Sequence, residues 1–309
     1  MNTKIVKFVL SLLCIGAVAG AAYYFLLRGD DDDPKTPTMT ATFEIVASDD
    51  CGDANSDDVL KDIEDGVKQR LEKLGYSEAT VKLVEETSKL EVTVPNVSDD
   101  EAESIINVLQ KRANLEFWAV CDSVDTKSIG SVVAADEDLA DKINLIGYDG
   151  LVGTVDKADM EYVSNALAAL KQQLPMNVKL VWSYKSVDGT DDGEFDLYAL
   201  KGRTPLMDGR YVADAYVDMY DEARTVVVID WMEEGYEEFA DVTGNNIGKS
   251  IAIVVDDVMY SAPRVNDRIN GSAVIAGAFS CQEAEELAAA LSSKPLPVAI
   301  KCVDYKIVK

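Results

Sequence analysis

The stretch ARTVVVIDWMEEGYEEFADVTGNNIGKSIAIVVDDVMYSAPRVN, residues Ala223 to Asn266, decides the fold. Thr225 to Trp231 is rich in β-branched and apolar residues, which predicts a strand. Glu233 to Val242 places its apolar residues at helical spacing. Ser250 to Val255 is almost continuously apolar, which is typical of a strand buried on both faces, and Val258 to Ser261 follows as its return strand. The order strand, helix, strand, strand therefore predicts a mixed α and β domain.

The turn GNNIGKS, from Gly244 to Ser250, resembles a phosphate-binding loop because Gly244, Gly248 and Lys249 match its glycines and lysine. The match is one residue short of the usual spacing. A phosphate loop also follows a strand and opens a helix, whereas here a helix comes first and a strand follows. We therefore predict a structural turn that ends the helix, with no nucleotide bound.

Composition excludes several classes of function. The 309 residues suffice for about two domains, and 48% of them are hydrophobic, which suits folded cores. The formal net charge of −27 makes nucleic acid an unfavourable partner. The chain has no histidine, which excludes histidine-dependent hydrolases and histidine-ligated metals. Its pairs of aspartates do not follow the calcium-loop pattern. We predict no cofactor, no metal site and no enzyme activity.

The N-terminus predicts a membrane anchor. Phe8 to Leu27 is an uncharged run of 20 residues, long enough to span a bilayer as a helix. Lys4 and Lys7 precede it and a single arginine follows, which places the N-terminus in the cytoplasm and the remaining chain outside the inner membrane. Cleavage after Ala19, as in a signal peptide, stays open as an alternative, and lipidation at Cys14 is weakly supported.

An internal repeat organises the rest of the chain. Ser98 and Ser280 each begin an S-x-x-E-A-E segment, a capping box that starts a helix. Each helix leads into an apolar strand, Leu115 to Val120 and Pro297 to Cys302. We predict two ferredoxin-like β-α-β-β-α-β halves that form one base, with an α+β domain inserted between them. The predicted boundaries are anchor 1–28, linker 29–40, first half 41–121, insertion 122–206 and second half 207–309.

The segments EGYEEFADVTGNNIGKSIAIVVDDVMYSAPRVN and INGSAVIAGAFSCQEAEELAAAL closely resemble the first periplasmic domain of the SecD family, membrane subunits that assist protein export. The resemblance extends over roughly Thr42 to Ala299. It implies that the inserted segment is a mobile head on the base. The family continues into further membrane helices that carry a proton pathway. No second span precedes Lys309, so we expect no proton coupling by this chain alone.

The resemblance implies a membrane-anchored, SecD-like extracytoplasmic protein whose partners are unfolded exported polypeptide and Sec translocon subunits. A diverged structural or regulatory envelope protein is the alternative. Trp182 and Tyr184 alternate on a predicted strand of the head, where they form a candidate polypeptide contact or simply part of its core. The two connections of the insertion, its entry at Cys121 to Asp138 and its exit at Gly202 to Gly209, suit a hinge. Few apolar residues cross this junction, which predicts a small interface. Disulfide pairing stays open among four cysteines: Cys51, Cys121, Cys281 and Cys302.

Overall fold

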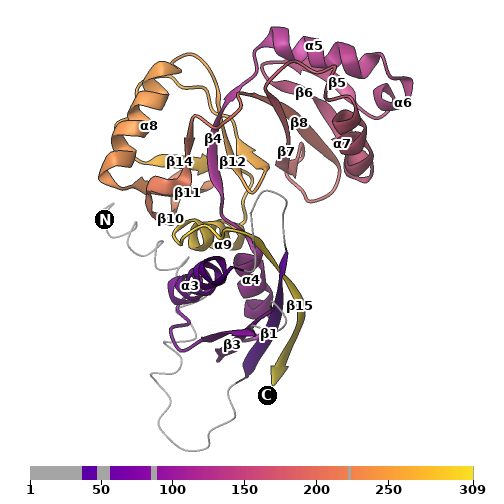
Figure 1. Ribbon diagram of the computed structural model, residues 1–309. Helices are drawn as coiled ribbons and strands as arrows, with labels where there is room; N and C mark the ends of the chain where they lie inside the picture. The colour runs from indigo at the N-terminus through magenta and orange to yellow at the C-terminus, as the bar shows by residue number, and fades with distance from the viewer. Residues whose placement is uncertain (1–36, 47–55, 85–88, 222–223, 309) are drawn as a thin grey trace, which may run out of the picture. The chain divides into compact units, whose positions relative to one another are not determined.

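The computed structural model describes residues 37–46, 56–84, 89–221 and 224–308 (Figure 1). The chain divides into two compact units. The first unit comprises Met1–Arg112, Cys281–Ala289 and Leu296–Lys309, and the second comprises Ala113–Ser280 and Ala290–Pro295. The predicted anchor, with Cys14, and the start of the predicted linker lie outside the described residues, as does Cys51. No helix in the described part of the chain is long and apolar enough to cross a membrane.

The first unit is a four-stranded antiparallel sheet with α3 and α4 packed on it (Figure 1). Apolar residues from α3, α4 and the sheet form one buried cluster, because each helix buries the stripe that its 3.6-residue period creates. The strand order is β15-β1-β3-β2. The bounds are β1 (Thr38–Val46), α3 (Asp57–Lys73), β2 (Thr80–Val84), β3 (Lys89–Pro95), α4 (Asp99–Gln110), α9 (Cys281–Leu291) and β15 (Ala299–Val308).

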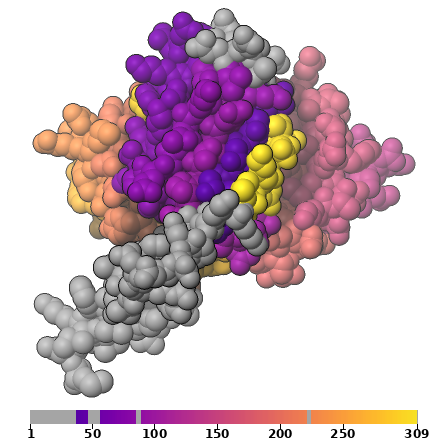
Figure 2. Space-filling model, turned by 90° about the horizontal axis from the view of Figure 1, so that it is seen from below, coloured from indigo at the N-terminus to yellow at the C-terminus, as the bar shows by residue number. Residues whose placement is uncertain are grey.

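The strand that completes the sheet of the first unit differs from the predicted one. The prediction used Leu115 to Val120, which forms β4 but pairs with a strand of the second unit. The place beside β1 is taken instead by β15, with Ile45 opposite Ile300 and Phe43 opposite Cys302. In Figure 2 the yellow C-terminal strand lies against the indigo N-terminal strand. Both candidate strands follow a helix that begins with the sequence S-x-x-E-A-E, so local sequence does not distinguish them.

The capping box at the start of α4 is confirmed. The Ser98 hydroxyl accepts from the backbone N–H of Glu101, and the Ser98 N–H donates to a Glu101 carboxylate oxygen at 2.8 Å. These bonds satisfy two backbone groups that a helix start leaves unpaired. The predicted second helix is also formed, as α9, whereas its cap at Ser280 stays a prediction.

The second unit contains two sheets. The larger has eight strands in the order β5-β6-β8-β7-β13-β12-β4-β9, and the smaller has three in the order β10-β11-β14. The strands are β4 (Leu115–Val120), β5 (Asn144–Tyr148), β6 (Leu151–Asp156), β7 (Val178–Ser186), β8 (Glu194–Lys201), β9 (Met207–Asp208), β10 (Val212–Asp221), β11 (Arg224–Trp231), β12 (Ile251–Val255), β13 (Val258–Ser261) and β14 (Ala273–Ala276). The helices are α5 (Ser123–Ala134), α6 (Glu137–Ala140), α7 (Met160–Ala169) and α8 (Glu233–Asn245).

The predicted second ferredoxin-like half does not form one sheet. Its elements are present as β11, α8, β12, β13, α9 and β15, but β11 lies in the three-stranded sheet, β12 and β13 in the eight-stranded sheet, and β15 in the first unit. All five residues of β12 are buried. The backbone N–H and C=O groups of a buried strand need hydrogen-bond partners on both edges. Strand β12 pairs with β4 on one edge and with β13 on the other.

The predicted insertion shares a sheet with the segments around it, so the prediction of a small interface at its junction was wrong. Strands β7 and β8 pair with β13 and β4. A buried apolar cluster also crosses this junction. It consists of Trp118, Val181, Leu200, Ala252, Val254 and Met259. These residues lie far apart in sequence, so no local run of apolar residues predicts the buried contact at this junction. The predicted boundaries at 122 and 206 fall inside the second unit and stay a prediction.

Candidate functional site

Three aromatic side chains of the second unit form a stack that is half-buried. The ring centroids of Tyr184 on β7 and Tyr260 on β13 lie 4.4 Å apart, with 15° between their planes. Phe279 adds a third ring, 5.8 Å from Tyr184 and 5.7 Å from Tyr260. The parallel pairing of β7 with β13 brings the two tyrosines together, because Ser183 lies opposite Met259 one residue earlier. We call these three residues the aromatic stack.

The turn between β7 and β8 is ordered beside the aromatic stack. The Ser186 hydroxyl bonds to the carboxylate of Asp188 at 2.5 Å, and Thr190 donates to the same carboxylate at 2.8 Å. These bonds hold the pKa of Asp188 below its ordinary value, the Ser186 hydroxyl being the largest cause. The Lys185 ammonium lies 5.1 Å from the Tyr184 ring centroid and 2.6 Å from a carboxylate oxygen of Asp191. The stack is therefore bordered by charged groups.

Trp182 belongs to a different set of contacts from Tyr184. Its indole N–H donates to the Ser164 hydroxyl of α7 at 3.0 Å. Its ring packs on the buried cluster that contains Val163 and Leu167. Of the two predicted contact residues, the structure thus places Tyr184 in the aromatic stack and Trp182 against α7. Tyr260 and Phe279 were missed in the sequence because a parallel strand pairing leaves no local signal of which residues meet.

The turn from Gly244 to Lys249 leads from a helix into a strand. Gly244 lies inside α8, and Gly248 has a φ of +80°, which glycine adopts without strain. The Gly248 N–H donates to Val265 O at 2.8 Å, and the Val265 N–H donates to Lys249 O at 2.8 Å. The Lys249 side chain is exposed. These bonds fix the turn to the segment before β14, and the helix N-terminus that a phosphate loop requires does not follow it.

The aspartates that follow β12 are engaged in the fold. Asp256 and Asp257 have φ of +52° and +64°, which makes a tight two-residue hairpin turn. The Asp256 carboxylate accepts from the backbone N–H groups of Ala113 and Asn114 at 3.1 and 2.9 Å. Asp257 lies 2.7 Å from the Lys179 ammonium. Asp256 therefore holds the start of β4 beside the end of β12, and Asp257 joins the same turn to β7.

Lys179 connects three strands of the large sheet. Its ammonium lies 3.1 Å from a carboxylate oxygen of Glu116 and 4.9 Å from the Trp118 ring centroid. The Trp118 indole N–H donates to the same carboxylate at 2.8 Å. Burial lowers the pKa of Lys179, but the bonds to Asp257 and Glu116 outweigh it, so the pKa lies above its ordinary value. This group contains no nucleophile and base in contact, and its geometry serves to join β4, β7 and the β12–β13 turn.

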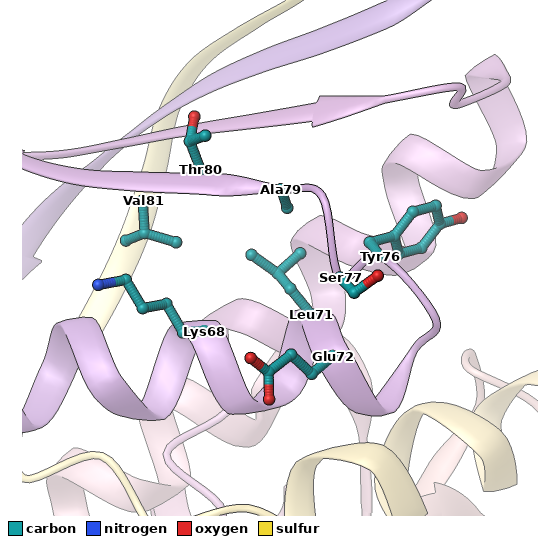
Figure 3. A pocket seen from close by; sticks show the side chains of 8 residues that line it. All are labelled: Lys68, Leu71, Glu72, Tyr76, Ser77, Ala79, Thr80 and Val81. Atoms are coloured by element: carbon teal, nitrogen blue, oxygen red, sulfur yellow. The ribbon is translucent and has the colours of Figure 1, made fainter.

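The first unit has a shallow pocket of about 280 Å³ between α3 and β2 (Figure 3). Leu71 extends into it from α3 and Val81 from β2 on the opposite side, and Lys68 and Tyr76 lie at its two ends. Burial raises the pKa of Tyr76 to about 12, with a further contribution from the Glu101 carboxylate. The Lys68 ammonium is 2.5 Å from Glu64. The lining of this pocket mixes apolar with polar and charged side chains and presents no arrangement of acid, base and nucleophile.

Three cysteines in the described part of the chain, Cys121, Cys281 and Cys302, form no disulfide bond. Cys121 is buried, and this burial raises its pKa to about 11. Burial also raises the pKa of Cys302. Thiolates are the reactive and metal-binding form of cysteine, so these shifts disfavour both roles at neutral pH.

Comparison with known proteins identifies the relatives of the chain. A family model described as SecDF, P1 head subdomain, matches residues 184–298. The protein translocase subunit SecD of Rhodothermus marinus is 27% identical over 285 residues, covering 78% of this chain and 45% of that protein. The chain is SecD-like. SecD of Acidaminococcus fermentans is 36% identical over 110 residues, covering 35% of this chain and 26% of that protein.

Two solved SecDF structures share the fold. The crystal structure of SecDF in its super-membrane-facing form aligns with a TM-score of 0.57 at 22% identity, covering 97% of this chain and 35% of that one. A structure described as a membrane component SecDF that enhances protein export aligns with a TM-score of 0.54 at 23% identity, covering 87% of this chain and 100% of that one. This chain spans less than half the length of the curated SecD relatives named above. The matched head subdomain, 184–298, begins within the predicted insertion and runs well beyond it.

Proposed function

We propose that this chain is an extracytoplasmic accessory protein of protein export, anchored in the inner membrane by one span at Phe8 to Leu27. It binds unfolded exported polypeptide, docks on subunits of the Sec translocon, and catalyses no reaction. The similarity to SecD supports the role in export. The single observation that carries polypeptide binding is the aromatic stack of Tyr184, Tyr260 and Phe279.

The chemistry of the aromatic stack suits a ligand of variable sequence. Aromatic rings offer a large contact area to aliphatic and aromatic side chains without requiring one particular hydrogen-bond pattern. The three rings already pack on one another, and the neighbouring turn is held by Ser186 and Thr190, so little side-chain entropy is lost on binding. A small, half-buried surface gives weak contact with each passing segment, which allows the polypeptide to slide.

The test is binding of a labelled, permanently unfolded secretory polypeptide to the full chain in lipid nanodiscs, followed by fluorescence anisotropy. Tyr184→Ala and Tyr260→Ala are expected to weaken binding about five- to thirtyfold, since an aromatic contact contributes ~1–2 kcal/mol. The matched control is Tyr148→Ala in β5 of the same unit, a tyrosine that is 66% exposed and outside the stack. Equal affinity of all four proteins would remove the stack from the proposal.

A second experiment addresses the partner. Affinity capture of the full chain from solubilised membranes is expected to retain translocon subunits. Retention of another envelope protein, with no translocon subunit, would favour the alternative of a structural or regulatory role outside export.

A further inference from the structure

Strand β10 is the outermost strand of the three-stranded sheet in the second unit. It pairs with β11 on one side, and no other strand of the described residues pairs with it. The ladder with β11 runs without a shift from Asp214 to Met219. The other edge of this stretch therefore presents backbone N–H and C=O groups in a regular array, which is the geometry to which another strand can add.

One face of this sheet carries an alternating pattern along β10. Asp214, Tyr216 and Asp218 point to the same face, because side chains alternate along a strand. Tyr216 lies opposite Val228, which in turn lies opposite Val274. Tyr216 is 43% exposed and Val274 is 39% exposed. The face thus has an aromatic and aliphatic row, with an acidic residue on each side of it on β10.

The carboxylates of Asp218 and Asp230 on this face accept hydrogen bonds from uncharged donors. Asp218 accepts from the backbone N–H of Met219 at 2.7 Å, and Asp230, opposite Asp214, accepts from the Ser272 hydroxyl. Neither donor neutralises the negative charge. Burial raises the pKa of Tyr216, with further contributions from Asp230, Asp218, the Tyr236 hydroxyl and Asp214. The negative groups therefore converge around the Tyr216 hydroxyl.

A tyrosine near the end of β10 already contacts a cation of the same chain. The Arg224 guanidinium of β11 lies 4.9 Å from the ring centroid of Tyr220, which lies two residues after Asp218 on β10 and is 69% exposed. A guanidinium over an aromatic ring is attracted by the electron-rich face of the ring. The end of β10 thus already holds one cation on a tyrosine of this strand.

We propose that β10 binds an extended, basic segment of another polypeptide as an added strand. Residues i and i+4 of this segment are lysine or arginine and lie opposite Asp214 and Asp218, while residue i+2 is apolar and lies opposite Tyr216. The occupant follows from charge complementarity and from the two-residue period of the strand. This surface is distinct from the aromatic stack, and the proposal does not depend on it.

The test compares two labelled peptides of identical composition in binding to the full chain. In the first, T-K-T-V-T-K-T, both lysines and the valine share one face of a strand. In the second, T-K-V-T-K-T-T, the lysines fall on opposite faces. We expect the first peptide to bind about five- to tenfold more tightly, because only it forms both cross-strand ion pairs on one face. The double variant Asp214→Asn and Asp218→Asn should lower its affinity to that of the second peptide.

The control is Glu237→Gln, which removes one exposed carboxylate from α8 and is expected to leave both affinities unchanged. Far-ultraviolet circular dichroism verifies that each variant is folded. Equal binding of the two peptides would overturn the proposal, because attraction to the overall charge of −27 does not depend on which face the lysines occupy. Absence of binding would also overturn it, and the acidic residues would then serve only to protect a sheet edge from aggregation.

Discussion

Arg70 is the most informative position for testing how the first unit is held together. It lies on α3 with its side chain fully buried. Its guanidinium donates to the carbonyls of Val108 and Leu109 at 3.2 Å, of Arg112 at 3.1 Å, and to that of Lys111. These carbonyls lie at and just beyond the C-terminus of α4, where a helix leaves acceptors unpaired and carries partial negative charge.

Arg70→Met keeps most of the side-chain volume and removes the charge and all the donors. A hydrogen bond from a charged donor contributes about 1.5–3 kcal/mol, and a cation at a helix C-terminus up to ~2 kcal/mol. Methionine avoids the desolvation of a buried guanidinium, which offsets part of this loss. We therefore expect a net loss of about 3–4 kcal/mol, a large part of the ~5–15 kcal/mol typical of a domain. Arg70→Lys should lose less, since it keeps the charge but not the planar fork of donors.

Urea unfolding of the variants can be assigned to a unit. All three tryptophans of the chain, Trp118, Trp182 and Trp231, lie in the second unit, whereas circular dichroism reports on both units. With a slope of ~2 kcal/mol per molar, Arg70→Met should move the dichroism midpoint of the first unit down by about 1.5–2 M urea. The control is Lys68→Met on the same helix, whose side chain is 45% exposed. A shift below about 0.5 M, or an equal shift in the control, would refute the reasoning.

Three further predictions concern the second unit. Asp256→Ala should lower the free energy of unfolding by about 2–3 kcal/mol, because it leaves the N–H groups of Ala113 and Asn114 without their acceptor. Asp256→Asn should lower it less, and urea unfolding followed by tryptophan fluorescence measures both effects. Burial raises the pKa of Asp196, so its ionisation destabilises the folded state. Asp196→Asn should match the original protein below the unfolded pKa of about 4 and become more stable than it as pH rises through the folded pKa; a constant difference across pH would contradict this. Cys121, with its pKa raised to about 11, should react with iodoacetamide at pH 8 more slowly than Cys281, as mapped by mass spectrometry; equal rates would contradict this.

Local sequence predicted the elements well. Residues 225–261 form β11, α8, β12 and β13 close to the predicted bounds, because each has a clear hydrophobic period and a turn signal at its end. Helix α4 begins at Asp99 with Ser98 as its N-cap, as the capping box predicts. Propensity and caps act over a few residues, and so they can be read from a single sequence.

Strand pairing could not be predicted in the same way. Leu115–Val120 and Ala299–Val308 both follow a helix that begins S-x-x-E-A-E, and only their burial against distant residues decides that β15 pairs with β1. The same limit applies to the site. Tyr184 was predicted from its strand, whereas Tyr260 and Phe279 meet it through pairings across many residues of sequence. Trp182 has the same local pattern as Tyr184 but contacts α7 instead.

The most direct measurement of the central claim is site-specific photocrosslinking in cells during export. A photoreactive amino acid replaces Tyr184 in the aromatic stack or, as the control, the exposed Tyr148 on β5. A secretory polypeptide is then arrested part-way across the membrane. The account predicts a crosslink from position 184 to the arrested polypeptide, lost when its export is blocked before entry, and little or none from position 148. Equal crosslinking at both positions, or none at 184, would contradict it.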